Sequence, residues 1–349
     1  MDAASEEKGS QITAAAAWIL VAVLTVVILR TLAFIFIPLC FALLICFALG
    51  IPMNFLEKIK VPRFLRIFVV ILGLLFLVYL LGRLVSLNVH QFQVMAPTFE
   101  KQFWAYTQAV LGIFNISADQ AREGIQAFFD NLKLGGLSSV GGVVKRFSGS
   151  FFSFLGSLIW VLLFMLFILG ERGSFQKRIV RISGESSHVL EVFHRITESI
   201  QSYLGLKTLI SLLTGMLVTI TLYIFGVPFA LLWGVLTFFL NFIPNIGSFV
   251  AVVPPVAITL FHFGSLTRTL GVLIVLVVIQ MVIGNYVEPK VMGKGLNLSP
   301  LVVLLSLLFW GWLWGLAGML LSVPMTAVLK IALEQLDQTN SVAILMEGD

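Results

Sequence analysis

Apolar residues in this chain occur in long unbroken runs, and short polar segments separate these runs. A helix needs about 20 largely apolar residues to cross the ~30 Å hydrocarbon core of a bilayer. Five runs have the length and composition of one crossing each: residues 12–29, 31–55, 67–82, 147–170 and 269–287. The pattern therefore predicts an all-α, polytopic membrane protein.

Two further runs are too irregular to be single crossings. Residues 208–267 contain no Asp, Glu, Lys or Arg, and Gly and Pro interrupt them repeatedly. Residues 295–329 are also free of charge, and as one straight helix they would be about 50 Å long. Two complete crossings would need about 40 residues. We therefore expect a re-entrant or broken-helix hairpin that folds near Gly311, Gly315 and Gly318, and about six to eight hydrophobic segments in all.

The two irregular runs share one plan, in which a proline opens the segment, a glycine-containing turn follows and a proline closes it. The opening and closing prolines are 26 residues apart in the first and 24 in the second. A broken helix frees backbone groups that hydrocarbon cannot satisfy, and paired breaks of this kind point to a transporter's binding site. Kinks or close helix packing remain the alternative, because Pro and Gly are common in membrane helices. The marked positions are Pro228, Pro244, Gly247, Pro254 and Pro255 in the first segment, and Pro300, Gly311, Gly315 and Pro324 in the second.

Basic residues and amphipathic stripes indicate the orientation. The segments 57–66 and 171–207 are rich in Lys and Arg, which places both in the cytoplasm together with the N-terminus. Residues 84–146 then lie outside, with a capping box at Ser117–Gln120 and apolar stripes at helical spacing. Those stripes are Phe99, Phe103, Tyr106 and Val110, then Ile125, Phe128, Phe129 and Leu132; a cytoplasmic stripe runs from Val189 to Tyr203.

The same pattern divides the chain into five regions. These are residues 1–83, the N-terminal transmembrane hairpin and third span; 84–146, an amphipathic periplasmic helical region; 147–206, the fourth span and a cytoplasmic amphipathic helix; 207–336, a transport core with the paired hairpins; and 337–349, a polar tail. The pattern therefore predicts a multi-pass membrane protein that has both hairpins in its C-terminal half.

Composition excludes several classes of function. Charged residues make up 11% of the chain and apolar ones 59%, whereas soluble domains contain about 25% charged residues. The net charge of +5 reflects loop orientation, so no nucleic-acid partner is expected. Cys40 and Cys46 share one apolar run, which argues against a disulfide or metal site. The sequence has no nucleotide-binding Gly-x-x-x-x-Gly-Lys motif and no catalytic or His-Glu-x-x-His constellation, so we expect no enzyme, no catalytic residue and no cofactor.

Polar side chains within the apolar C-terminal half are the candidate substrate contacts. Asn241 and Asn245 are favoured because a neutral amide costs less to bury than a charge. Glu288 can pair with Lys290 or Lys294, or exchange a proton; an ordinary ion pair at a helix end is the alternative. His262 is expected to pack rather than to relay protons. The expected substrate path comprises Asn241, Pro244, Asn245, Gly247, Pro254, Pro255, Asn285, Tyr286, Glu288, Trp310, Gly311, Gly315 and Pro324.

Three long motifs carry a family resemblance: residues 241–255 (NFIPNIGSFVAVVPP), 284–295 (GNYVEPKVMGKG) and 307–324 (LLFWGWLWGLAGMLLSVP). With these motifs the chain resembles the autoinducer-2 exporter family, the PerM-like membrane transporters, most strongly from Lys207 to Leu336. The resemblance implies a bacterial inner-membrane protein that exports autoinducer-2, a small furanosyl polyol, or facilitates its passage, as a homo-oligomer, a pentamer in close relatives. Some relatives resemble sodium(lithium)/proton antiporters, so that alternative and a channel-like oligomer stay open.

The types of residue in the C-terminal half favour a polyol as the substrate over a transported ion. Ion-coupled antiport usually needs acidic groups in the membrane, and residues 208–287 contain none, which leaves Glu288 alone. A polyol needs neutral donors and acceptors, which Asn241, Asn245, Tyr286 and Trp310 can supply. The sequence therefore favours alternating access, with the hairpins moving relative to the N-terminal spans.

Overall fold

The computed structural model describes residues 3–113, 156–171, 188–292, 297–334 and 339–348, together with a few single positions between them. All regular structure in these ranges is helical, which confirms the predicted fold class. Within them, five helices are long and apolar enough to cross a membrane, and a sixth candidate is a bent pair. The capping box at 117–120, the stripe from Ile125 to Leu132 and Lys294 lie outside the described residues.

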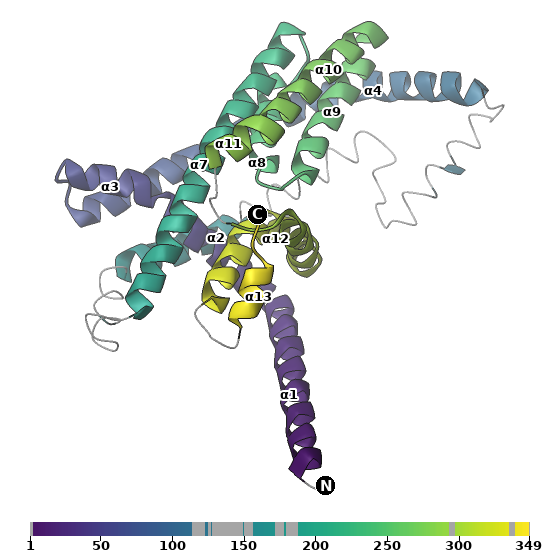
Figure 1. Cartoon of the computed structure of the whole chain (residues 1–349). Helices are drawn as coiled ribbons and strands as arrows, with labels where there is room; N and C mark the ends of the chain where they lie inside the picture. Colours follow the sequence, from purple (N-terminus) through teal and green to yellow (C-terminus); the bar gives the residue numbers. More distant parts are fainter. Residues whose placement is uncertain are drawn as a thin grey trace. The chain divides into compact units, whose positions relative to one another are not determined.

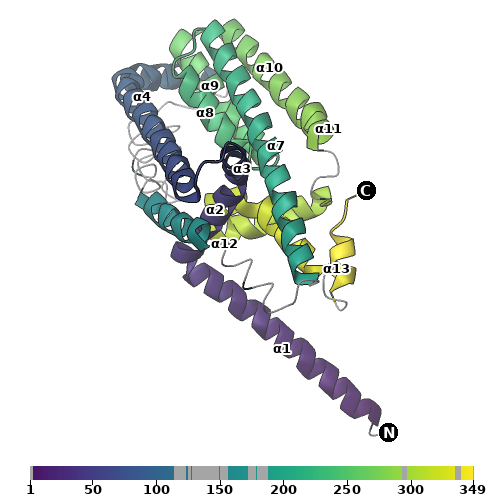
Figure 2. The ribbon, with the colours of Figure 1, turned by 90° about the vertical axis from the view of Figure 1, so that its left-hand side faces the viewer.

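The chain forms two compact units, which Figures 1 and 2 show together. One unit contains Met1–Cys46, Leu163–Val192 and Asn297–Asp349, and the other contains Phe47–Leu162 and Phe193–Leu296. We call them the terminal unit and the central unit.

The terminal unit contains the first two helices and the last two. These are α1 (Ala3–Thr31), α2 (Ala33–Ala48), α12 (Pro300–Leu333) and α13 (Asn340–Leu345). The axes of α1 and α2 meet at 86°, so the predicted N-terminal pair is bent sharply next to Arg30. The guanidinium of Arg30 lies 5.0 Å from the ring centre of Trp312, a favourable cation–π distance.

The central unit is a group of helices, of which the longer ones are apolar (Figure 1). In order these are α3 (Gly50–Lys58), α4 (Arg63–Ile113), α7 (His188–Ile224), α8 (Ala230–Leu240), α9 (Ile246–Phe263), α10 (Leu266–Val282), a π-helical turn η1 (Ile283–Val287) and α11 (Glu288–Met292). A further apolar helix covers Gly156–Glu171, across the division between the units. In the central unit, α9 packs against α8, α10 and α4.

Helix α4 contains both the third predicted span and the apolar stripe from Phe99 to Val110. A straight helix of its 51 residues would be about 77 Å long, much longer than the hydrocarbon core. The aromatic residues of its second half pack on the other helices: Phe92 stacks on Phe229, and Phe99 is buried edge-to-face against Phe92 and His262. His262 also contacts Phe263, so it is a packed histidine, as expected.

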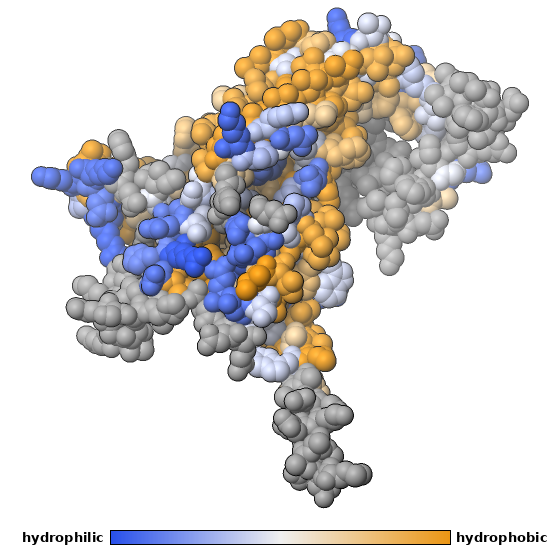
Figure 3. All heavy atoms as spheres, viewed as in Figure 1, coloured by the Kyte–Doolittle hydropathy of each residue, from blue (hydrophilic) through white to orange (hydrophobic). Residues whose placement is uncertain are grey.

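Large apolar side chains remain on the outer faces of many helices. Figure 3 shows them along the visible faces of α7, α9 and α10, while hydrophilic side chains gather around α3. In α1, consecutive apolar residues such as Trp18, Ile19 and Leu20 are exposed. An apolar exterior of this extent is stable only in lipid or against another apolar surface.

Candidate substrate cleft

The first hairpin consists of α8, the turn Asn241–Asn245 and α9. Helix α8 has 11 residues and spans about 16 Å, which is too short for a crossing. After the turn, Gly247 lies directly on the end of α8, where an added Cβ atom would be 1.8 Å from the Leu240 carbonyl oxygen. Only glycine allows this approach, and the predicted break near Pro244–Gly247 is confirmed.

Asn245 has a strained backbone at the tip of this hairpin. Its φ and ψ are 58° and −53°, and the amide N of Ile246 lies 2.6 Å from the carbonyl oxygen of Pro244. These values define a γ-turn with positive φ at its central residue, a rare and strained conformation. Such conformations cost about 1–3 kcal/mol and are often found at functional sites. The strained residue lies beside the cleft that is described next.

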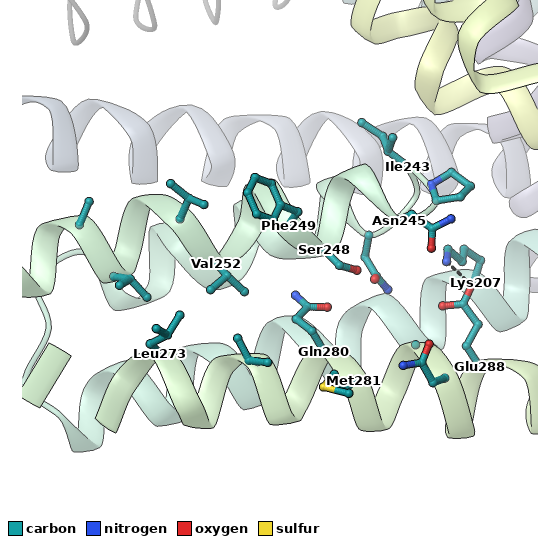
Figure 4. A pocket seen from close by; sticks show the side chains of 18 residues that line it. Lys207, Ile243, Asn245, Ser248, Phe249, Val252, Leu273, Gln280, Met281 and Glu288 are labelled. Atoms are coloured by element: carbon teal, nitrogen blue, oxygen red, sulfur yellow. Dashed lines mark hydrogen bonds and ion pairs between the residues drawn. The ribbon is translucent and has the colours of Figure 1, made fainter. Parts of the chain in front are cut away.

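A cleft of about 620 Å³ lies beside this turn, between α7, α9, α10 and the η1–α11 segment (Figure 4). Eighteen residues of the central unit line it. They are Lys207, Asn241, Ile243, Pro244, Asn245, Ser248, Phe249, Val252, Val253, Val256, Ala257, Leu273, Val277, Gln280, Met281, Gly284, Asn285 and Glu288. The volume is within the range of about 300–1,000 Å³ that is typical of small-molecule sites.

One end of the cleft, which we call the polar end, gathers uncharged hydrogen-bonding side chains. Asn245 and Ser248 come from the start of α9, and Gln280 and Asn285 come from the end of α10 and from η1. Within the described part of the chain, these four side chains make no hydrogen bond to protein. Their donors and acceptors are therefore free for a polar ligand.

Asn241, the first residue of the turn, also lines the cleft and is almost fully buried. Its side-chain nitrogen lies 3.1 Å from the hydroxyl oxygen of Ser211 on α7, to which it donates a hydrogen bond. This bond fixes the orientation of the amide and does not use its oxygen. It also ties the turn of the first hairpin to α7.

Lys207 and Glu288 form an ion pair at the same end (Figure 4). The Lys207 side chain is 4% exposed, whereas that of Glu288 is 23% exposed. A buried lysine is stable only if it is paired, and the carboxylate supplies the opposite charge. The sequence offers Lys290 or Lys294 as partners of Glu288, whereas in the structure its carboxylate pairs with Lys207 of α7 and Lys290 is exposed.

The helix that carries Asn285 and Glu288 changes its hydrogen-bonding pattern at the cleft. The N–H of Glu288 donates to the Ile283 carbonyl, five residues earlier, so the helix widens to a π-turn. Pro289 follows and has no N–H, so the carbonyl of Gly284, five residues before it, has no such donor. Gly284 lines the cleft, and π-turns are frequent at functional sites.

The second hairpin is in the terminal unit, and a glycine again lies directly against the backbone of its other arm. Helix α12 is broken at Gly315, whose φ of 61° and ψ of −139° are not helical. Trp310 donates its indole N–H to the hydroxyl of Thr326 at 3.2 Å, although 16 residues of straight helix would separate them by about 24 Å. A Cβ atom on Gly318 would be 1.8 Å from the Trp310 carbonyl oxygen, so the predicted fold-back is confirmed.

The closing prolines do not end either hairpin. Helix α9 continues past Pro254 and Pro255 to Phe263, and α12 continues past Pro324 to Leu333. The expectation that these prolines end the segments was therefore wrong. Proline is tolerated inside a membrane helix because side chains, neighbouring helices and local adjustments can satisfy the freed carbonyls, which in α9 are those of Val250 and Ala251.

The cleft brings together five of the expected path residues, namely Asn241, Pro244, Asn245, Asn285 and Glu288. The others do not line it. Tyr286 is 73% exposed, and Gly247, Pro254 and Pro255 shape the hairpin backbone. Trp310, Gly311, Gly315 and Pro324 belong to the second hairpin of the terminal unit.

Sequence reasoning missed Lys207, Ser248, Gln280, Met281 and Gly284 as cleft residues. Lys207 was counted only as a loop charge, because it directly precedes the long uncharged run. One signal was available: Gln280, Gly284 and Glu288 are four residues apart and share one helix face.

Comparison with known proteins finds matches among transport proteins. Residues 17–338 match the family model described as AI-2E family transporter. The chain is 37% identical to a putative transport protein of Haemophilus influenzae over 83% of each chain. It is 34% identical to the AI-2 transport protein TqsA of Escherichia coli over 91% of each chain, and 37% identical to the putative transport protein YhhT of the same organism over 80% of this chain and 78% of YhhT.

Proposed function

This chain belongs to the AI-2E family of transporters and is a multi-pass membrane protein, and on that premise we propose that its cleft binds autoinducer-2 and releases it on the other side of the membrane. The family is one of transporters and not of enzymes. Among the relatives compared above, TqsA alone is named for AI-2, so the substrate is part of the proposal.

The observation that supports this substrate is the set of free, uncharged polar groups at the polar end. Asn245, Ser248, Gln280 and Asn285 offer amide and hydroxyl groups without a partner in the described part of the chain. A polyol presents donors and acceptors without net charge, so it can use these groups and needs no counter-ion. Glu288 is already paired with Lys207, which leaves no free carboxylate in the cleft for a cation. The sodium(lithium)/proton antiporter is therefore the weaker candidate.

Alternating access would occur by movement of the first hairpin. The turn Asn241–Asn245 is held by one side-chain hydrogen bond to α7 and contains a strained residue, so two arrangements of the turn can be close in free energy. Substrate at the polar end contacts the hairpin through Asn245 and Ser248 and α10 through Gln280. It can therefore favour the closed arrangement through different contacts in the two states.

The remaining features of the proposal come from the family resemblance. We propose a location in the bacterial inner membrane with the N-terminus in the cytoplasm, and a homo-oligomer, a pentamer. The basic segments 57–66 and 171–207 support this orientation. Mass measurement in detergent by native mass spectrometry tests the subunit count, and a monomer would contradict it.

Transport of autoinducer-2 into proteoliposomes tests the function. We expect saturable uptake, with Asn245→Ala and Gln280→Ala each lowering transport at limiting substrate about 2- to 10-fold, as expected for the loss of one hydrogen bond. Val278→Ala is the matched control, because Val278 is exposed on α10 and does not line the cleft. Uptake without saturation would favour a channel-like oligomer. A flux that requires a sodium or proton gradient and is lost in Glu288→Gln would favour the antiporter.

A reversible crosslink tests the motion. In the double variant Ser248→Cys/Gln280→Cys, a cleavable bifunctional thiol reagent would join α9 to α10 across the cleft. We expect uptake to stop after crosslinking and to return after cleavage of the reagent. Unchanged uptake in the crosslinked protein would show that the first hairpin does not need to move.

A further inference from the structure

The polar end accounts for only part of the cleft. Helices α9 and α10 are joined by a short loop and run antiparallel, so the start of α9 faces the end of α10. Beyond the polar residues, both helices present only apolar side chains to the cleft (Figure 4). We call this part the apolar end; it consists of Phe249, Val252, Val253, Val256 and Ala257 from α9, and Leu273 and Val277 from α10.

The apolar end is long enough to hold part of a ligand. Phe249 and Ala257 are eight residues apart on α9, which corresponds to about 12 Å along the helix axis. A ring-sized polyol bound at the polar end would not reach this wall, and apolar surface that a ligand covers contributes to its binding. An aliphatic chain that continues from the polar group would cover it.

The charges of the cleft define the polar group of such a ligand. Its two ionised side chains, Lys207 and Glu288, neutralise each other, and all other polar side chains that line it are uncharged. A ligand with net charge would have no counter-charge and would be desolvated at a cost. An uncharged, hydroxylated head matches the free amides and the hydroxyl of Ser248.

We propose that the cleft binds uncharged amphiphiles, with a hydroxylated head at the polar end and an aliphatic chain along α9 and α10. The volume of about 620 Å³ suits a diffusible small molecule. This inference deepens the proposed function, on which it rests only in taking the cleft as the substrate site. It names a wider substrate class, in which affinity increases with the length of the aliphatic chain.

Binding of methyl, butyl and hexyl β-glucoside to the protein in nanodiscs tests the inference. Saturation-transfer NMR gives the affinities, after subtraction of the signal from empty nanodiscs. Burial of one methylene group corresponds to about fourfold in affinity, so butyl glucoside should bind at least about tenfold more tightly than methyl glucoside even if burial is partial. Equal affinities of the three glucosides would overturn the proposal.

Two variants separate the ends of the cleft. Ala257→Phe should fill the apolar end, so that hexyl glucoside loses its advantage while methyl glucoside binds as before. Ile274→Phe is the matched control, because Ile274 is exposed on α10 outside the cleft and should change neither affinity. Preserved chain-length dependence in Ala257→Phe would place the aliphatic chain elsewhere and contradict the proposal.

The experiment also distinguishes other outcomes. The titration is repeated in nanodiscs of dimyristoyl and dioleoyl phosphatidylcholine; affinities that change with the bilayer lipid would show that a lipid chain occupies the groove, against a diffusible ligand. Because binding is measured without transport, failed autoinducer-2 uptake together with chain-length-dependent binding would reject only that substrate. Autoinducer-2 uptake without chain-length dependence would reject only the amphiphile.

Discussion

Trp314 donates its indole N–H to the backbone carbonyl of Leu29 at 3.0 Å. Leu29 lies in the last turn of α1, where helix carbonyls have no N–H four residues further on in the same helix. The sharp bend between α1 and α2 leaves this carbonyl accessible, and the tip of the second hairpin reaches it. The N-terminal pair and the second hairpin are therefore joined by a hydrogen bond between residues 285 positions apart.

We expect Trp314→Phe to lower the free energy of unfolding of the terminal unit by about 1 kcal/mol, because a partly buried carbonyl loses its donor. Thermal unfolding in detergent measures this change. Trp18→Phe is the control, because Trp18 is largely exposed on α1. Equal melting temperatures of Trp314→Phe and the parent would show that the bond contributes nothing to stability.

The ion pair at the cleft predicts a non-additive double mutant. Lys207→Met leaves the carboxylate of Glu288 without its cation and should cost about 1–3 kcal/mol, less than for a fully buried pair because Glu288 is partly exposed. Lys207→Met/Glu288→Gln removes both charges and should recover most of this loss. The measurement is chemical unfolding of Lys207→Met, Glu288→Gln and the double variant.

Lys290→Met serves as the comparison for the ion pair. Lys290 is exposed on α11 near Glu288, so its loss should change stability by less than about 0.5 kcal/mol. A double variant less stable than Lys207→Met would contradict the assignment of the pair.

The close approach of Gly247 to Leu240 predicts that even a methyl group is not tolerated there. A Cβ atom at Gly247 would overlap the Leu240 carbonyl, so Gly247→Ala should destabilise the protein by about 1–3 kcal/mol or more and reduce the yield of monodisperse protein. Gly284→Ala is the control, because no atom lies within 4 Å of the position of its Cβ. Similar size-exclusion profiles for the two variants would show that Gly247 does not lie directly against Leu240.

The strained turn predicts an unusual order of stability at position 245. Glycine adopts positive φ without steric cost, so Asn245→Gly should be at least as stable as the parent and about 1 kcal/mol more stable than Asn245→Ala. Melting temperatures of the three proteins check the order. If Ala at this position is as stable as Gly, the backbone at the tip is not strained.

The hairpins could be predicted from the sequence, whereas most of the cleft could not. A charge-free run of a length between one and two crossings leaves few arrangements other than a fold-back, and glycines at close crossings mark where it occurs. Lys207 and Glu288 are 81 residues apart, and neither residue type indicates its partner. Which polar residues share a cleft depends on how α9 is rotated against α10, and this rotation is set by packing over both helices.

The sequence predicts that Pro254 and Pro255 end the hairpin, because proline usually ends a helix in soluble proteins. In α9 the helix continues through both, because a membrane helix tolerates the missing donors where its surroundings stabilise it. Local propensity was overridden here by the surroundings of the helix.

The two adjacent prolines in α9 make that helix easier to bend in the turn that precedes them. Each proline removes one backbone hydrogen bond, so the carbonyls of Val250 and Ala251 have no N–H four residues further on. These carbonyls lie between Ser248, at the polar end, and Val256, at the apolar end. The wall of the cleft can therefore bend most easily where its two chemical surfaces meet, so that the aliphatic side can open or narrow independently of the hydroxyl-binding side.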